Sequence, residues 1–195
     1  MAILFFLGLF QLSEYYVCGG VGVSAATWSR VGYVAITMLP PLGLHLAHVI
    51  AKNKKRILVW FAYASGITWA LVFGLSEWAF GGHVCAGNYV IFQLRNNVGG
   101  AYFAYYYFWL FMVLILCSYW YTKTTNKRQK EALHYLVLGY LVFILPTTIV
   151  NTLKPSTMLG LPSIMCGFAV IYAVILTFLI LPRINNSKSI SPKQP

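Results

Sequence analysis

Acidic residues are almost absent from this chain. Its 195 residues include no aspartate and three glutamates, Glu14, Glu77 and Glu131. Charged residues make up 9% of the sequence, whereas soluble domains contain about 25%. Catalysis by paired carboxylates would need two of the three glutamates close together, and Glu131 is expected on the opposite side of a membrane from the other two. The composition therefore disfavours a soluble domain and indicates lipid as the solvent, in agreement with a mean hydropathy of +0.72.

Catalytic and cofactor motifs are also absent from the sequence. It contains no G-x-G-x-x-G, P-loop, C-x-x-C, H-E-x-x-H or G-x-S-x-G pattern. Its last apolar segment has no lysine that could form a Schiff base with retinal. We therefore assign no catalytic residue, cofactor or metal to the sequence, and whether the protein is an enzyme stays open.

Six long apolar segments account for most of the chain. Each is close to the ~20 residues that a helix needs to cross a bilayer. Because backbone groups in lipid must be satisfied within the segment, we expect helices. The sequence predicts an all-α polytopic membrane bundle of six transmembrane helices, with a single domain over 1–184 and a disordered cytoplasmic tail over 185–195. The predicted segments are 2–18, 29–51, 57–75, 101–122, 131–150 and 161–182.

Basic residues gather in the loops on one side of this predicted topology. The chain has 14 Lys and Arg, of which only Arg30, Arg95 and Lys154 fall on the other side. The positive-inside rule then places both termini in the cytoplasm and the protein in a plasma (inner) membrane. Because the basic residues sit in short runs between apolar segments, the partner that we expect is the lipid bilayer and not a nucleic acid.

Glu14 is the only acidic residue in the interior of a predicted span, since Glu131 is the first residue of the span 131–150. A carboxyl group in lipid is costly and usually faces a partner or a wet cavity. One interpretation is structural, as an ion pair with Arg30 or as a protonated acid bonded to Ser or Tyr. The other is a ligand or proton site at the outer mouth of the bundle. We expect Glu14 to point toward the second helix, and the candidate ligand-binding residues are Gln11, Glu14, Arg30, Tyr33 and Thr37.

Two cysteines fall on the predicted outer side. Cys18 ends the first span, and Cys85 lies in the long loop 76–100. An oxidising compartment would allow a disulfide between them. The loop is rich in apolar and aromatic residues, so we expect it to fold back as a lid or interfacial element, with a short strand over YVIF. Cys117 and Cys166 lie in apolar spans and are interpreted as packing residues.

The second span contains two consecutive prolines, Pro40 and Pro41. Because proline lacks an N–H donor, these residues predict a kink or hinge and free the carbonyls of Ile36 and Thr37. The histidines at positions 45 and 48 lie on one helix face, but no third metal ligand at a matching depth accompanies them. In the third span, small residues at 64–66 predict a close contact with another helix.

Three short patterns carry a family resemblance. They are FQLSE (residues 10–14), WSRVGY (28–33) and LPPLGLHL (39–46). Glu14, WSRVGY and Leu39-Pro40-Pro41 resemble the seven-helix membrane sensor region at the N-terminus of some bacterial histidine kinases. FQLSE and LPPLGLHL are similar to segments of a group of small prokaryotic membrane proteins. In the sensor family one more helix precedes the Glu-bearing helix and a kinase domain follows, and this sequence contains neither. The resemblance implies a sensor-like bundle without its output domain.

These observations leave two main classes of function. The first is a sensor-like, receptor-like or accessory membrane module that binds a ligand or partner near the outer mouth of the bundle. The second is a small transporter or membrane enzyme that uses Glu14 and nearby polar residues. A structural assembly subunit is a third class. A membrane protein partner or a second copy of the chain is compatible with each of them.

Overall fold

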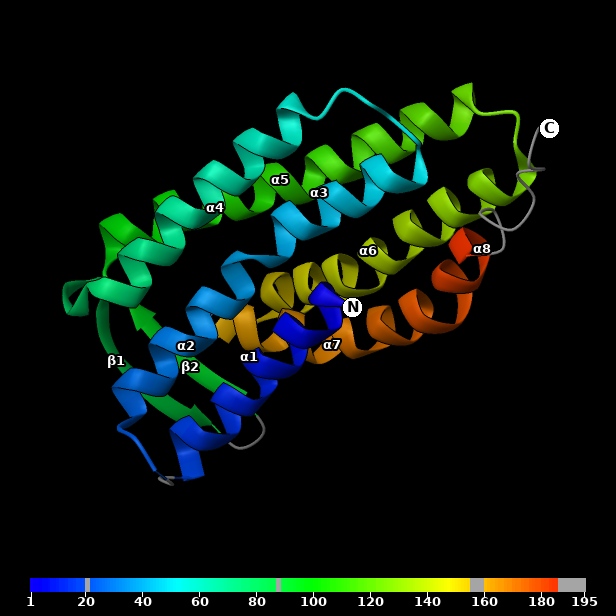
Figure 1. The fold of residues 1–195 in the computed structure, drawn as a ribbon. Helices are drawn as coiled ribbons and strands as arrows, with labels where there is room; N and C mark the ends of the chain where they lie inside the picture. The colour runs from blue at the N-terminus through cyan, green and yellow to red at the C-terminus, as the bar shows by residue number, and fades with distance from the viewer. Residues whose placement is uncertain (20–21, 87–88, 155–159, 186–195) are drawn as a thin grey trace.

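The computed structural model describes residues 1–19, 22–86, 89–154 and 160–185. It is an all-α bundle with a small β-hairpin at one end (Figure 1). Six helical segments are long and apolar enough to cross a bilayer, which confirms the predicted fold class. Of the predicted tail over 185–195, only Asn185 lies within the described residues. The helices are α1 (Ala2–Gly19), α2 (Ala25–Thr37), α3 (Leu39–Ile50), α4 (Ile57–Leu75), α5 (Asn96–Lys123), α6 (Lys127–Leu153), α7 (Leu161–Ile175) and α8 (Leu181–Asn185).

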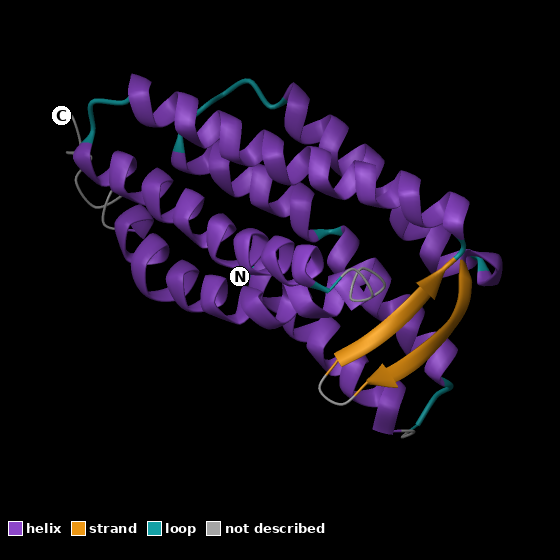
Figure 2. Ribbon diagram, turned by 180° about the vertical axis from the view of Figure 1, so that it is seen from behind, coloured by secondary structure: helices purple, strands orange, loops and turns teal. Residues whose placement is uncertain are grey.

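The helices lie side by side along one axis, and the hairpin crosses one end of the bundle (Figure 2). We call this the hairpin end. The opposite end holds the turns after α3 and α5 together with α8, and we call it the basic end. Nine described basic residues lie in its connections and adjoining helix ends: Lys52, Lys54, Lys55, Arg56, Lys123, Lys127, Arg128, Lys130 and Arg183.

The second span is divided into two helices at Met38. Helix α2 ends at Thr37, and α3 begins at Leu39 with Pro40 and Pro41 in its first turn, a position that tolerates proline. The predicted interruption is therefore present, as a full break between two helices. The carbonyl of Thr37 accepts a hydrogen bond of 2.9 Å from the hydroxyl of Tyr105 in α5. The break is thus fastened to a neighbouring helix.

An aromatic cluster around Tyr33 fills the bundle below the hairpin. Tyr33 is 1% exposed, and its ring centroid lies 4.8 Å from that of Phe73 and 5.6 Å from that of Tyr102. Two hairpin residues, Phe80 and Phe92, lie 5.3 and 5.4 Å from the same ring. Aromatic pairs at such distances add to the free energy gained from burial. The cluster therefore joins α2, α4, α5 and the hairpin.

The hairpin is formed by β1 (Phe80–Ala86) and β2 (Tyr89–Leu94), preceded by a short 3-10 turn, η1 (Glu77–Ala79). The strands pair antiparallel, with an irregularity in register between Phe80 and Gly82. Gly82 has φ +140°, a conformation that side chains with a Cβ atom rarely adopt. The expected short strand over YVIF is therefore present as part of β2.

Candidate functional site

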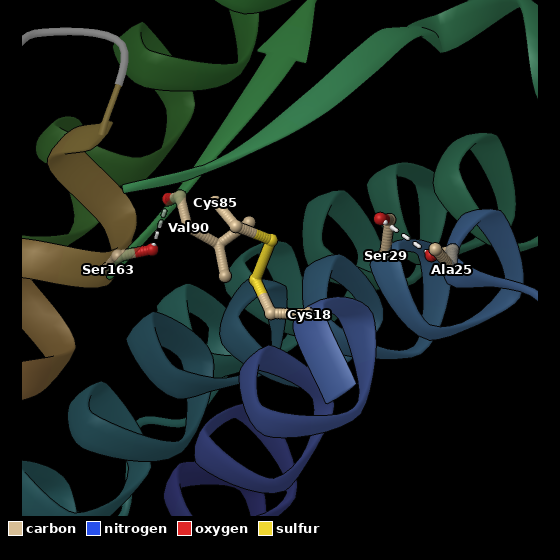
Figure 3. The surroundings of a disulfide bond; sticks show 6 residues. All are labelled: Cys18, Ala25, Ser29, Cys85, Val90 and Ser163. Carbon is tan, nitrogen blue, oxygen red and sulfur yellow. Dashed lines mark hydrogen bonds between the residues drawn. A yellow bond between two sulfur atoms is a disulfide. The ribbon is translucent and has the colours of Figure 1, made fainter. Parts of the chain in front are cut away.

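A disulfide joins the hairpin to α1. Cys18 at the end of α1 and Cys85 in β1 are bonded, with 5.9 Å between their Cα atoms (Figure 3). This is the bridge considered from the sequence, and it closes a loop across three helical segments. It attaches one strand of the hairpin to the first helix.

A second attachment joins the hairpin to α7. The hydroxyl of Ser163 donates a hydrogen bond of 2.6 Å to the carbonyl of Val90 in β2 (Figure 3). Ser163 is 4% exposed, so this bond forms where water competes little. With the disulfide and the aromatic contacts to Tyr33, the hairpin is held at three places and covers the end of the bundle.

An open pocket of about 300 Å³ lies between the start of α2 and β1. We call it the outer pocket. Its volume is at the lower end of the range of small-molecule sites, about 300–1,000 Å³. The residues that line it are Ala26, Ser29, Arg30, Phe80, Gly81, Gly82 and His83. It therefore combines a guanidinium, an imidazole and a hydroxyl with an aromatic wall.

The outer pocket lies at the start of the segment Ala25–Ile50, at the hairpin end of the bundle. The segment Ala25–Ile50 has 26 residues, a length of about 39 Å at 1.5 Å per residue, compared with a hydrocarbon core of about 30 Å. Near its start, the hydroxyl of Ser29 donates to the carbonyl of Ala25 at 2.9 Å. The segment is therefore longer than a hydrocarbon core, and the outer pocket lies at one of its ends.

Gln11 and Glu14 lie apart from the outer pocket's lining residues. Ser163 and Cys166 of α7 lie near the carboxyl of Glu14. Glu14 Oε1 and Gln11 Nε2 are buried atoms with no hydrogen-bond partner. We expected Glu14 to point toward the second helix, whereas the neighbours identified for its carboxyl belong to α7. Unpaired buried polar atoms are rare and often mark a site for water or ligand.

Tyr33 and Thr37 occupy a third place, inside the aromatic cluster. The hydroxyl of Thr37 donates to the carbonyl of Tyr33 at 2.6 Å and also lies 3.1 Å from the hydroxyl of Tyr102. Both residues are at most 1% exposed. The five predicted ligand-binding residues are thus not gathered in one place. Glu14 lies near α7, Arg30 lines the outer pocket, and Tyr33 and Thr37 belong to the aromatic cluster. Gln11 lies on α1 with a buried side-chain nitrogen.

A narrow cavity of about 30 Å³ lies deeper in the bundle. Cys166 and Tyr172 of α7 line it, together with Tyr106, Tyr140 and Leu7 and several other apolar residues from four further helices. The hydroxyl of Tyr172 is buried without a hydrogen-bond partner. The space is about that of one or two water molecules.

The two histidines of α3 have partners within the protein. His45 Nδ1 lies 3.1 Å from the hydroxyl of Tyr63, and His48 Nδ1 lies 2.9 Å from the carbonyl of Leu44. Within the described residues, no group of three His, Cys, Asp or Glu side chains is arranged to hold a metal ion. Cys117 and Cys166 are buried thiols, in keeping with their interpretation as packing residues.

Of the seven lining residues of the outer pocket, sequence reasoning selected only Arg30. It missed Ala26, Ser29, Phe80, Gly81, Gly82 and His83. The pair of glycines followed by histidine was a usable signal, because adjacent glycines in an apolar loop often mark a bulge. It also missed Ser163 and Cys166, which lie far from Glu14 in the sequence. Comparisons with protein family models, with curated proteins and with solved structures give no match to this chain.

Proposed function

We propose that this protein is a sensor-like or receptor-like membrane module that binds a small polar ligand in the outer pocket. The observation that carries the proposal is the pocket of about 300 Å³ that brings Arg30 of α2 next to Gly81, Gly82 and His83 of the hairpin. A guanidinium offers five donors, so the ligand class that fits best is a small molecule with a carboxylate or phosphate group. The hairpin, which forms one side of the outer pocket, would respond when a ligand binds there.

Two features support a signalling role for the hairpin: its strand β1 lines the outer pocket, and the same strand contacts the aromatic cluster. One strand, β1, supplies both Cys85 and the pocket residue His83, while Phe80 at its start contacts Tyr33 in the aromatic cluster. A ligand that moves β1 would therefore shift side chains that pack against α2, α4 and α5. A ligand alters such an equilibrium only by its differential affinity for the two states, and the strand gives it direct contact with the element that moves.

The test is ligand-dependent stability of the purified protein in lipid nanodiscs. Acetate, succinate and inorganic phosphate serve as probes, and unfolding is followed by tryptophan fluorescence. At 100 times its Kd, a probe that binds only the folded state adds about 2.7 kcal/mol. We expect at least one probe to raise the Tm of the wild type and of the control Arg95→Gln, whose exposed side chain also lies at the hairpin end.

Two variants of the outer pocket complete the test. Arg30→Gln should abolish the rise in Tm, and His83→Ala, which changes an exposed side chain, should weaken it without affecting the fold. The proposal fails if no probe raises the Tm. It also fails if Arg30→Gln responds as strongly as Arg95→Gln, because the site would then lie elsewhere.

We further propose that the protein resides in a plasma (inner) membrane with both termini on the cytoplasmic side. The concentration of basic residues at one end supports this orientation through the positive-inside rule. The disulfide between Cys18 and Cys85 lies at the other end, and disulfides persist in oxidising compartments. Both arguments support an outer location of the hairpin end.

A second candidate function is a small transporter or membrane enzyme that acts through Glu14. The buried, unpaired atoms Glu14 Oε1 and Gln11 Nε2 favour it, because a buried carboxyl with unmet bonding capacity suits proton or cation transfer. Its test is proton or substrate uptake into proteoliposomes. Uptake that Glu14→Gln abolishes, with the Tm unchanged, would favour this function over a receptor.

A further inference from the structure

A second pocket lies at the basic end, far from the hairpin. It is formed by the turn after α3, the start of α6 and the start of α8, and its space is about 30 Å³. Three cationic side chains line it, Lys52, Arg128 and Arg183, next to the apolar residues Val49 and Ile184. We call it the basic pocket. Three separate segments thus bring positive charges to one hollow.

Arg183 is held in a fixed position beside this pocket. Its Nε donates to Glu131 Oε2 at 3.0 Å, and its Nη1 donates to the carbonyl of Leu179 at 2.7 Å. The guanidinium also lies over the ring of Tyr135, 4.4 Å from the centroid. A side chain constrained in this way loses little conformational freedom when a ligand arrives. Arg183 is therefore a preorganised lining residue of the basic pocket.

Lys52 occupies an unusual backbone conformation. Its φ is 53°, and it is the one non-glycine residue with positive φ within the described ranges. It follows the last turn of α3, where its N–H donates to the carbonyl of Val49 at 3.2 Å and that of Asn53 donates to His48 at 3.0 Å. Glycine usually fills this position because it adopts the left-handed region without strain. The sequence places a cation there instead, at the edge of the basic pocket.

The basic pocket begins where the lipid-facing surface ends. Phe178 lies in the π-helix η3 (Leu176–Ile180), which joins α7 to α8, five residues before Arg183. It is 70% exposed, and Val49 is 44% exposed. Exposed apolar side chains on spanning helices face acyl chains. Of the residues described at this end, nine are basic and one, Glu131, is acidic. A phosphate held here would find cations on one side and hydrocarbon on the other.

We infer that the basic pocket binds the phosphate of an anionic phospholipid. Basic hollows between transmembrane helices suit phosphate headgroups, since Lys and Arg each contribute through charge and hydrogen bonds. The apolar residues Val49 and Ile184 would lie beside the acyl chains and favour a lipid over a soluble phosphate compound, which shares the same headgroup chemistry. This site is separate from the outer pocket and does not depend on the function proposed there.

The test compares lipid retention in variants of equal charge. The protein is reconstituted in nanodiscs of phosphatidylcholine with or without phosphatidylglycerol, and native mass spectrometry counts the phosphatidylglycerol that stays bound. Lys52→Gln/Arg128→Gln removes two cations from the basic pocket. Lys54→Gln/Lys55→Gln removes two from the same end outside its lining. We expect retention to fall about tenfold or more in the first variant and to stay near the wild-type level in the second.

Two further experiments complete the test. The first distinguishes an effect on lipid binding from an effect on folding, and the second distinguishes a lipid from a soluble phosphate compound as the ligand. Lys52→Gly relieves the left-handed strain, so it should raise the Tm in phosphatidylcholine by about 2–4 °C and still reduce phosphatidylglycerol retention. Equal losses in the two charge variants, or undiminished retention in Lys52→Gly, overturn the inference. If inorganic phosphate or glycerol phosphate at millimolar concentration displaces the lipid and stabilises the protein equally, the ligand is a soluble phosphate and the assignment to a lipid is wrong.

Discussion

Gly66 of α4 offers a sharp test of how the break in the second span is held. A Cβ atom added at Gly66 would lie 2.9 Å from Pro41 Cγ and 3.1 Å from the hydroxyl oxygen of Tyr105. Neither neighbour yields easily, because the proline ring is rigid and the Tyr105 hydroxyl is bonded to the carbonyl of Thr37. Gly66→Ala therefore forces a displacement at the junction of α2 and α3.

The magnitude follows from a matched comparison. A Cβ atom added at Gly8 in α1 would meet no other atom within 4 Å, so Gly8→Ala changes only backbone propensity, by about 0.5–1 kcal/mol in favour of the helix. Gly66→Ala gains the same contribution but adds overpacking, which costs about 1–3 kcal/mol. We expect Gly66→Ala to be less stable than Gly8→Ala by about 1–3 kcal/mol.

The assay is unfolding in mixed detergent–SDS micelles, followed by circular dichroism and tryptophan fluorescence. Tyr105→Phe removes one of the two close contacts of the new Cβ, so the effects of Gly66→Ala and Tyr105→Phe should be less than additive. If Gly66→Ala is as stable as Gly8→Ala, the close packing of α4 on the break is wrong. Strict additivity would show that the Tyr105 hydroxyl is not one of the obstacles.

The remaining predictions concern the hairpin, the topology and Glu14. Replacing Cys18 and Cys85 with serine should expose the hairpin to hydrogen exchange and lower stability by at most about 4 kcal/mol, the chain-entropy value for a closed loop of this size (sequence separation 67); unchanged exchange would contradict the attachment. A cysteine at Asn126 should react with an impermeant thiol reagent only from the cytoplasmic side, and labelling from outside would refute the orientation. Ser163→Ala removes the donor to Val90 and should cost about 1–3 kcal/mol. Glu14→Gln should change the free energy of unfolding by less than about 1 kcal/mol, because glutamine keeps an oxygen acceptor and Glu14 Oε1 makes no hydrogen bond that would be lost; equal costs of the two substitutions would contradict this difference.

Patterns with a fixed local cause could be predicted from the sequence. The spans follow from apolar length, and the break at Met38 follows from the missing donors of Pro40 and Pro41. The small residues of the third span predicted a close contact, and Trp109 Nε1 does donate to Ser65 Oγ at 3.0 Å. These features depend on residues that are neighbours in the chain or on a single physical rule.

The outer pocket could not be predicted because its shape depends on a change of register. The pairing of β1 and β2 is irregular between Phe80 and Gly82, and a shift of one residue reverses which side chains face the bundle. No alternation in the sequence of the loop specifies that irregularity in advance. Arg30 was identified from its charge alone, while His83 becomes a candidate only when β1 is placed beside α2.

The direction of the Glu14 side chain could not be predicted from the sequence either. Ser13 Cβ would lie 3.2 Å from a Cβ atom added at Gly32, so this side of α1 packs closely on α2. Glu14 is the next residue and is rotated by about 100° around the helix axis. It therefore turns away from α2 and toward Ser163 and Cys166 of α7. Because α2 follows α1 in the sequence, we expected α2 to be the partner of Glu14. The face of α1 that contacts α2 at Gly32 instead carries Ser13. Because α1 packs on α2 through the small residue Ser13, the side chain of Glu14 points in another direction. Its atom Oε1, which has no hydrogen-bond partner, lies between α1 and α7.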